Sequence, residues 1–205
     1  KKILSLLTAF AMVFGIIAAP FTSASAAGES TEEGAKTNTI VLHKILQTAD
    51  NMKAKDNEKK DVLPGRKGID GTPYDGNAIT DLAAYFGENS KEIKDVFFAV
   101  QNAQGQYIGK DGNALANPSI TDVNFEDNVL GGKTTETGLT LDTSKLTQDK
   151  TEYKIVEIVE LSTYKSEDGK ILAAKKAVPV DITLPITNEK GVVLEAHVYP
   201  KNTEE

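Results

Sequence analysis

The chain has 205 residues, with 23 basic and 30 acidic side chains, a net charge of −7 and no cysteine. A negatively charged chain without a long Lys/Arg block lacks the positive surface that nucleic-acid binding requires, so we expect no nucleic-acid partner. Without cysteine, disulfide scaffolds, thiolate metal sites and cysteine nucleophiles are excluded. The apolar fraction of 40% is typical of a folded chain with a sizeable core.

The first 26 residues are organised as a secretory signal peptide. Two lysines precede an apolar run from Ile3 to Ala19, and an Ala-x-Ala pattern follows at Ala24 and Ala26. This order of basic, apolar and small residues is typical of a cleaved export signal. A membrane anchor is the alternative, but the run is short for a spanning helix and ends in a cleavage-like sequence. We therefore expect a secreted protein whose mature part is not embedded in a membrane.

The first half of the mature chain contains signals for one strong strand and one helix. Small polar residues over 27–38 predict a tether, and branched residues predict a strand over 39–46. Both signs of charge are interleaved over residues 50–66, which is typical of a solvated loop. Apolar spacing predicts a short helix over Asn77–Phe86, with Asn77 as its cap and the glycine that follows as its end.

The second half contains signals for several strands separated by turns. Residues 96–108 predict a hairpin about the Gln104-Gly105 turn, and residues 109–137 are rich in the Gly, Asn and Asp that favour long loops. Many strands with one or two short helices predict an antiparallel β-sandwich with long loops. Further strands are predicted over 139–141, 153–161, 177–184 and 192–198, with turns at 168–169 and 189–191.

Two charged side chains fall where the strand pattern asks for hydrophobic ones. Alternate residues of a strand share a face, so Lys44 lies in phase with Leu42, and Glu157 lies in phase with Ile155. Because burying one unpaired charge is prohibitive, we expect Lys44 and Glu157 to meet or to neutralise each other by proton transfer. The alternative is that both side chains extend to solvent at a sheet edge or form an ordinary ion pair.

The last strand adds an asparagine to this pair. Val198 is in phase with Asn202 if the extended path continues through Pro200, so Asn202 is expected to point inward. Tyr199 and Lys201 have the opposite phase, and we expect them to face outward. The alternative is that Asn202 has only a structural role and caps a turn.

A lysine, a carboxyl group and an asparagine that meet inside a protein can form a covalent link. Burial favours the neutral forms of an amine and of a carboxylic acid. The neutral amine of Lys44 can then attack the carboxamide of Asn202, with Glu157 relaying protons, to give an amide and ammonia. Such a bond would join the first strand to the last and replace the disulfide that this chain lacks.

Several segments of the chain resemble the N-terminal domain of backbone (shaft) pilins from Gram-positive sortase-assembled pili, especially streptococcal ones. The resemblance covers the signal peptide and the mature chain, and it is loose over residues 50–76. The final motif, His197 to Thr203, is its most specific part. The matching segments are Val41-Leu42-His43-Lys44-Ile45, Tyr153-Lys154-Ile155-Val156-Glu157, Leu161-Ser162-Thr163-Tyr164, Lys176-Ala177-Val178-Pro179-Val180 with Leu184-Pro185, and His197-Val198-Tyr199-Pro200-Lys201-Asn202-Thr203.

The resemblance implies two kinds of covalent bond. In the motif Tyr199-Pro200-Lys201-Asn202, Lys201 would be the acceptor whose amine a pilus-specific sortase joins to the C-terminal threonine of the next subunit. An intramolecular bond would link Lys44 to Asn202, with Glu157 as the catalytic carboxyl. The partners implied are that sortase, the next backbone pilin and minor pilins, on a secreted, cell-wall-attached pilus. No cofactor and no enzymatic turnover are implied.

The same resemblance implies an immunoglobulin-like sandwich over residues 39–202, with residues 203–205 beginning a linker. The chain has no sorting signal of the LPxTG type at its end, so we expect a fragment that lacks further domains. Leu184-Pro185-Ile186-Thr187-Asn188 imitates such a signal, but Asn188 replaces the needed glycine. We interpret Pro185 as the end of a strand.

Other functions are carried as alternatives. A host-binding adhesin or minor pilin could use the long loops Asp50–Gly76 and Gly109–Thr137 as its recognition surface. His43 and His197 have no nearby ligand spacing, so we expect neutral surface or edge histidines and no metal site. A secreted hydrolase would need convergent acids or a nucleophile with its base, and the sequence offers neither.

Overall fold

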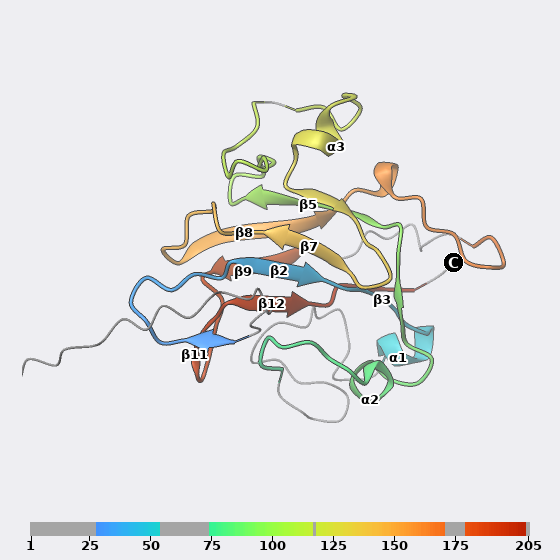
Figure 1. Ribbon diagram of the computed structural model, residues 1–205. Coiled ribbons are helices and arrows are strands. Elements are labelled where there is room, and N and C mark those ends of the chain that lie inside the picture. The colour runs from blue at the N-terminus through green and yellow to red at the C-terminus, as the bar shows by residue number, and fades with distance from the viewer. Residues whose placement is uncertain (1–27, 54–73, 117, 171–178, 204–205) are drawn as a thin grey trace, which may run out of the picture.

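The computed structural model describes residues 28–53, 74–116, 118–170 and 179–203, and these ranges form a mainly β structure with short helices (Figure 1). The helices are α1 (Ala49–Lys53), α2 (Leu82–Phe86) and α3 (Phe125–Asn128), with a 3-10 turn at Val159–Leu161. The strands are β1 (Glu29–Ser30), β2 (Thr39–Leu42), β3 (Lys44–Leu46), β4 (Lys91–Ile93), β5 (Phe97–Asn102), β6 (Gly131–Lys133), β7 (Leu139–Asp142), β8 (Thr151–Glu157), β9 (Val180–Leu184), β10 (Thr187–Asn188), β11 (Gly191–Val193), β12 (Glu195–Val198) and β13 (Lys201–Asn202).

The strands form small sheets whose pairing is mainly antiparallel, as the sequence predicts. The described residues give the strand orders β12-β2-β7, β13-β3-β4, β6-β5-β8-β9 and β1-β11-β10. Two pairs depart from this pattern, because β12 runs parallel to β2 and β13 runs parallel to β3. The first long strand and the end of the chain therefore lie side by side and cross together from one sheet into the next.

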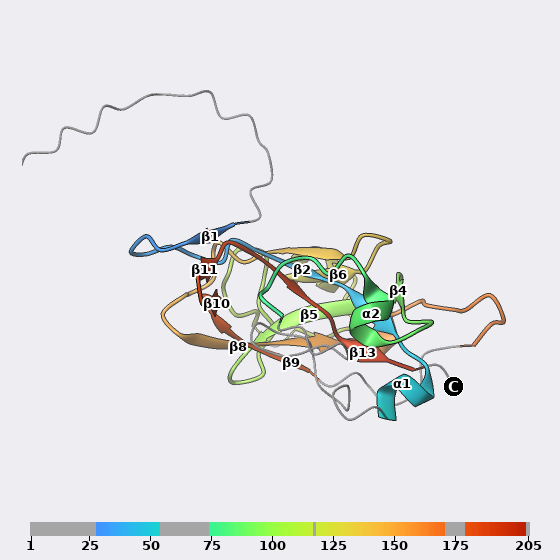
Figure 2. The ribbon, with the colours of Figure 1, turned by 90° about the horizontal axis from the view of Figure 1, so that it is seen from below.

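The main core lies between the sheet that contains β2 and the sheet that contains β8 (Figure 2). It is built from alternate residues of these strands, so that Ile40 and Leu42 of β2 face Ile155 of β8 and Val180 of β9. A second, aromatic cluster lies on the other side of β3 and β12. Its buried members are Ile45, Tyr74, Tyr85, Phe86 and Tyr199.

The predicted helix is correct at its end and wrong at its start. It begins at Leu82 because Asp81 is the cap, its side chain accepting a hydrogen bond from the backbone N–H of Ala84 at 2.9 Å. Asn77 instead donates its side-chain amide to Asp75. Gly87 ends the helix with a positive φ of 99°, and its N–H bonds the carbonyl of Ala83.

Other boundaries also differ from the prediction. The hairpin about Gln104-Gly105 is confirmed, with Ile108 N–H bonding the Val100 carbonyl. The strand predicted over 153–161 stops at Glu157, and a 3-10 turn follows. Residues 109–137 hold α3 and β6 in addition to loops.

The predicted tether is more ordered than its composition suggests. Within its described part, β1 pairs with β11, and Thr37 is buried and accepts the N–H of Ile186 on its hydroxyl. The signal peptide and residues 177–178 of a predicted strand lie outside the described residues.

Candidate functional site

Lys44 and Glu157 meet in the main core, as their strand phases predict. The Lys44 Nζ and Glu157 Oε2 atoms are 2.9 Å apart, and the two side chains are 0% and 2% exposed. Glu157 is the last residue of β8 and lies opposite Phe98 of β5, whose ring centre is 5.6 Å from Lys44 Nζ. The alternative of two side chains extending to solvent is therefore wrong.

Asn202 lies on the same face of the strand pair as Lys44. Backbone N–H groups of Ile45 and Gln47 bond the carbonyls of Pro200 and Asn202, each at 2.8 Å. This register places Asn202 beside Leu46, two residues along the strand from Lys44. Asn202 is buried, and its side-chain oxygen accepts the N–H of Thr203. The three residues of the predicted internal link thus belong to one buried region.

Tyr199 and Lys201 lie on the opposite face of the last strand from Asn202, as predicted, but the prediction that this face is exposed to solvent is wrong. His197, Tyr199 and Lys201 are only 8%, 1% and 7% exposed. Sequence periodicity assumed that the second face of the strand meets solvent. In the structure that face is covered, because Tyr74 and the residues of α2 pack against Tyr199.

The histidines are not surface or edge residues, because they meet inside this second face. His43 Nε2 and His197 Nδ1 are 2.8 Å apart, and His43 Nδ1 is 2.7 Å from Glu92 Oε1. Sequence reasoning missed this contact. Strand alternation places His43 on the face of Ile45 and His197 on the face of Tyr199. This pattern could have predicted the contact only if the two strands were known to be parallel neighbours.

Burial controls the ionisation of the aromatic side of this region. It raises the pKa of Tyr199 to about 12 and also raises the pKa of Tyr74. Burial and the neighbouring His43 lower the pKa of His197. Both phenols are therefore neutral hydrogen-bonding groups at physiological pH: Tyr199 accepts the N–H of Ile79, and Tyr74 donates to the carbonyl of His197.

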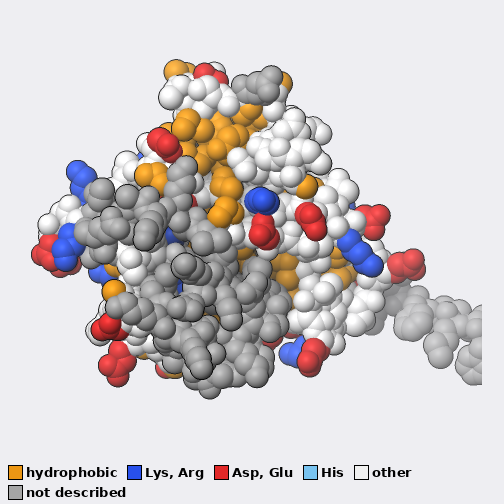
Figure 3. All heavy atoms as spheres, turned by 180° about the vertical axis from the view of Figure 1, so that it is seen from behind, with side chains coloured by type: hydrophobic (Ala, Val, Ile, Leu, Met, Phe, Trp, Pro, Cys, Tyr) orange, Lys and Arg blue, Asp and Glu red, His pale blue; other side chains and the backbone are white. Residues whose placement is uncertain are grey.

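The loop surface proposed for an adhesin is only partly described, since residues 54–73 lie outside the described ranges. In the other loop Val123 is 90% exposed. Figure 3 shows hydrophobic side chains gathered toward the end of the molecule that carries α3, where cluster members such as Tyr107 and Leu161 are only partly buried.

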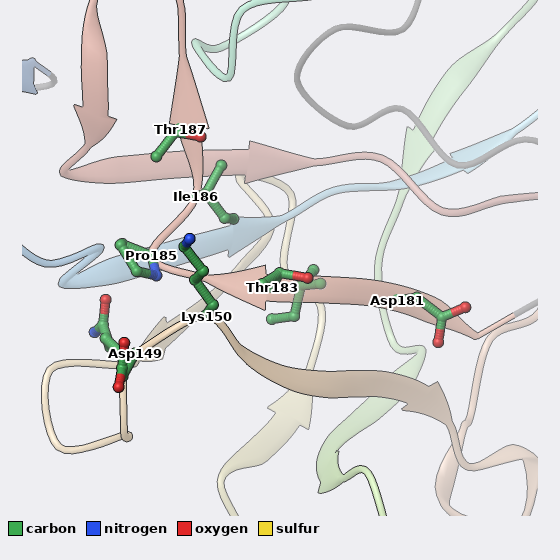
Figure 4. A pocket seen from close by; sticks show the side chains of 9 residues that line it. Asp149, Lys150, Asp181, Thr183, Pro185, Ile186 and Thr187 are labelled. Carbon is green, nitrogen blue, oxygen red and sulfur yellow. The ribbon is translucent and has the colours of Figure 1, made fainter.

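A separate groove runs along the edge of β9 (Figure 4). Asp149, Lys150, Thr183 and Pro185 line it, and its lining includes none of the residues of the predicted links. Among the described residues, no group of three or more His, Asp or Glu is placed to hold a metal ion. No helix in the described ranges is long and apolar enough to cross a membrane.

Comparison with known proteins relates this geometry to a family. A family profile described as Gram-positive pilin subunit D1, N-terminal domain, matches residues 35–203. The solution structure of the RrgB pilus backbone D1 domain from Streptococcus pneumoniae is 30% identical, with a TM-score of 0.58, over 90% of this chain and 95% of that domain. No curated protein matches significantly.

Two structures of full-length RrgB from Streptococcus pneumoniae are also similar. They are 31% and 33% identical, with TM-scores of 0.63 and 0.56, and each match covers 82% of this chain. The chain spans about a quarter of these proteins, 26% and 25% of their lengths. The chain belongs to the family of Gram-positive pilin D1 N-terminal domains. Within this family it is a domain of the streptococcal shaft-pilin type.

Proposed function

We propose that this domain is the acceptor end of a covalently polymerised pilus shaft, linked to the next subunit through Lys201 and internally cross-linked between Lys44 and Asn202. Its partners are a pilus-specific sortase, the next backbone pilin and minor pilins, and the mature protein is exported by the signal peptide and attached to the cell wall. The observation that carries the proposal is the buried contact of 2.9 Å between Lys44 and Glu157, with Asn202 on the same face of the adjoining strand.

The internal bond follows from ordinary amide chemistry. The Glu157 carboxylate takes a proton from the Lys44 ammonium, and the neutral amine attacks the Asn202 side-chain carbonyl. Glu157 then gives its proton to the carboxamide nitrogen and takes one from the attacking nitrogen. The carbon–nitrogen bond of the carboxamide breaks, ammonia leaves, and an amide joins the two side chains. An apolar, water-excluded surrounding supports this reaction because it favours the neutral amine and keeps hydrolysis away.

Intact mass tests the internal bond. We expect the secreted protein to weigh about 17 Da less than its sequence mass, through loss of one ammonia. Glu157→Gln should restore the unmodified mass, allowing for the substitution. Glu152→Gln, on the exposed face of the same strand, is the matched control and should still lose ammonia. A wild-type protein at full sequence mass, with no branched tryptic peptide joining Lys44 and Asn202, would remove the bond from this account.

The acceptor role of Lys201 rests on the Tyr-Pro-Lys-Asn motif and on its place in the sheet. Lys201 belongs to the two-residue strand β13, which among the described strands pairs with β3 alone. Because Lys201 is only 7% exposed, its amine can reach the sortase only if this short edge strand moves. Little regular backbone pairing opposes such a local movement.

Polymerisation by the cognate sortase tests the acceptor. Lys201→Arg keeps a positive charge but removes the primary amine, so we expect it to abolish laddered polymers without altering the fold. Lys91→Arg, on the exposed part of neighbouring strand β4, is the matched control and should polymerise normally. Persisting ladders in Lys201→Arg would point to another acceptor lysine.

The two bonds together have a mechanical consequence. Tension applied at Lys201 passes to the adjacent Asn202 and then through the internal amide to Lys44. The last strand therefore does not need to resist force through its backbone hydrogen bonds alone. This supports a role in the shaft rather than in a terminal adhesin, which has no need of an acceptor lysine.

A further inference from the structure

Four side chains form a continuous series of contacts that joins β4, the junction between β2 and β3, and β12. Glu92 Oε1 lies 2.7 Å from Nδ1 of His43, whose Nε2 lies 2.8 Å from Nδ1 of His197. His197 Nε2 in turn lies 3.3 Å from Glu195 Oε1. Both rings are nearly parallel, with centres 5.1 Å apart and an angle of 18° between their planes. This series of contacts joins the first long strand to the last on the face opposite Lys44.

The number of available hydrogens fixes which nitrogen atoms carry them when both histidines are neutral. Two neutral histidines carry two N–H groups, and three contacts compete for them. The two short contacts take them: His43 donates from Nδ1 to Glu92, and His197 donates from Nδ1 to Nε2 of His43. The third contact, 3.3 Å to Glu195, has no hydrogen and is the longest of the three. The observed distances thus match the neutral pair.

Protonation changes the contacts in two steps. One added proton on His197 Nε2 fills the contact with Glu195, and the pair then carries one positive charge. A second proton must enter the contact between the rings, where Nε2 of His43 already accepts a hydrogen from Nδ1 of His197. Two N–H groups would then point at each other across 2.8 Å, and two positive rings would lie side by side.

The surroundings give the pair little freedom to relieve this conflict. Tyr199 stacks on His43 with ring centres 4.7 Å apart, and Tyr74 donates to the backbone carbonyl of His197. Both histidines are less than one-tenth exposed. Within the described ranges, the charged or titratable groups that contact the histidines are Glu92 from β4, Glu195 from β12, and the neutral phenols of Tyr74 and Tyr199.

We propose that His43 and His197 form a proton-operated clamp, which holds the last strand on the first with at most one added proton and opens when the second proton binds. Beside the clamp, the first strand bonds the last through His43 N–H to the Val198 carbonyl and Ile45 N–H to the Pro200 carbonyl. These bonds hold β12 and β13 in register. Acidification therefore loosens the strand that carries Lys201, while the main core stays closed.

The direction of the titration agrees with this geometry. Burial, and secondly the neighbouring His43, lower the pKa of His197 below its ordinary value of 6.5. Because a charged His43 lowers the pKa of His197, the folded pair resists carrying two positive charges. The stability that the clamp contributes is therefore complete above about pH 6.5 and is lost as the pH falls through this lowered, second step.

Nitrogen-15 NMR of the histidine side chains tests the clamp directly, because the chain contains only two histidines. At neutral pH we expect both rings as Nδ1–H tautomers with unprotonated Nε2 atoms, and a scalar coupling across the shared hydrogen bond. On acidification we expect two separate steps, the second below the ordinary histidine range. Two independent titrations near the ordinary value would overturn the proposal. This measurement holds whether or not the internal amide has formed.

Hydrogen exchange measures the opening itself. Between about pH 7 and pH 4.5 we expect the amides of His43 and Ile45 to lose protection, about tenfold for each unit by which the second pKa is lowered. The amides within β8 are the internal control and should keep their protection. His43→Gln still accepts the hydrogen of His197 but binds no proton, so this loss should disappear. If the variant loses protection like the wild type, the carboxylates and not the histidines control the strand.

Discussion

The two faces of the strand pair formed by β2–β3 and β12–β13 are both buried, but by different chemistry. One face turns Lys44 and Asn202 into the main apolar core, where Glu157 meets the lysine at 2.9 Å. The other face carries Lys201 and His197 and is covered by an aromatic layer. Since the pair is parallel, burial on both faces is the usual outcome. The alternation of side chains thus separates a site for a bond within the molecule from a site for a bond between molecules.

The largest effect is expected on the core face. Lys44→Met leaves the Glu157 carboxylate buried without its cationic partner, whereas Lys44→Met with Glu157→Leu removes the stranded charge as well. We expect the single variant to be less stable than the double variant by about 3–5 kcal/mol in the free energy of unfolding. Urea denaturation at neutral pH, followed by circular dichroism, measures both values.

The double replacement also separates ion-pair energetics from cross-linking. Both variants lack the amine and cannot form the amide, so each should have the full mass of its own sequence, while their unfolding midpoints should differ. Equal midpoints would mean that the buried carboxylate has found another partner, and that the core face does not depend on Lys44 for charge balance.

How far sequence alone could reach differs between the two faces. Strand alternation was enough to place Lys44 and Glu157 together, because a charge in an apolar phase must find a partner whatever the details of the register. The exposure of Lys201 could not be obtained in this way. Periodicity tells which residues share a face, but only tertiary packing of Tyr74 and α2 decides whether that face meets solvent.

Short-range signals show the same limit. Gly87 ended the helix as predicted because its positive φ is a local requirement. The start moved to Leu82 because Asp81, and not Asn77, bonds an amide of the first turn, and both residue types are good caps. The contact between His43 and His197 depended on parallel pairing of segments at opposite ends of the chain, which no local pattern encodes.

On the aromatic face a moderate effect is expected from one hydroxyl. Tyr199→Phe leaves the N–H of Ile79 without its acceptor at 2.7 Å and costs about 1–2 kcal/mol. The packing of the ring is retained, so the loss reports the hydrogen bond. Tyr107→Phe, in the partly buried cluster near α3, is the control and should change the unfolding free energy by less. Equal losses would show that the aromatic layer is not specially dependent on Tyr199.

Alkaline pH should weaken the same face. Burial raises the pKa of Tyr199 from 10.0 to about 12, so the folded chain holds this proton more tightly than the unfolded chain. The resulting stability is complete below about pH 10 and is lost as the pH rises from there toward 12. Urea midpoints measured between about pH 8 and pH 11 should fall less steeply in Tyr199→Phe than in the wild type. Parallel curves would mean that other groups govern alkaline unfolding.

The smallest effect is expected at the rim of the aromatic face, from Glu195→Gln. The contact of 3.3 Å to His197 carries no hydrogen in the neutral pair, so stability at pH 7 should change by at most about 1 kcal/mol. The carboxylate nevertheless raises the pKa of His197 against the larger effects of burial and His43, and removing its charge should lower that pKa further. Nitrogen-15 NMR of the ring measures this shift.

Glu92→Gln provides the contrast to Glu195→Gln. It removes the charged acceptor of the Nδ1 hydrogen of His43, at 2.7 Å, and should cost more stability at neutral pH. If Glu195→Gln were the more destabilising of the two at pH 7, the third contact would already hold a hydrogen in the neutral protein, and the order of protonation along the chain would be reversed.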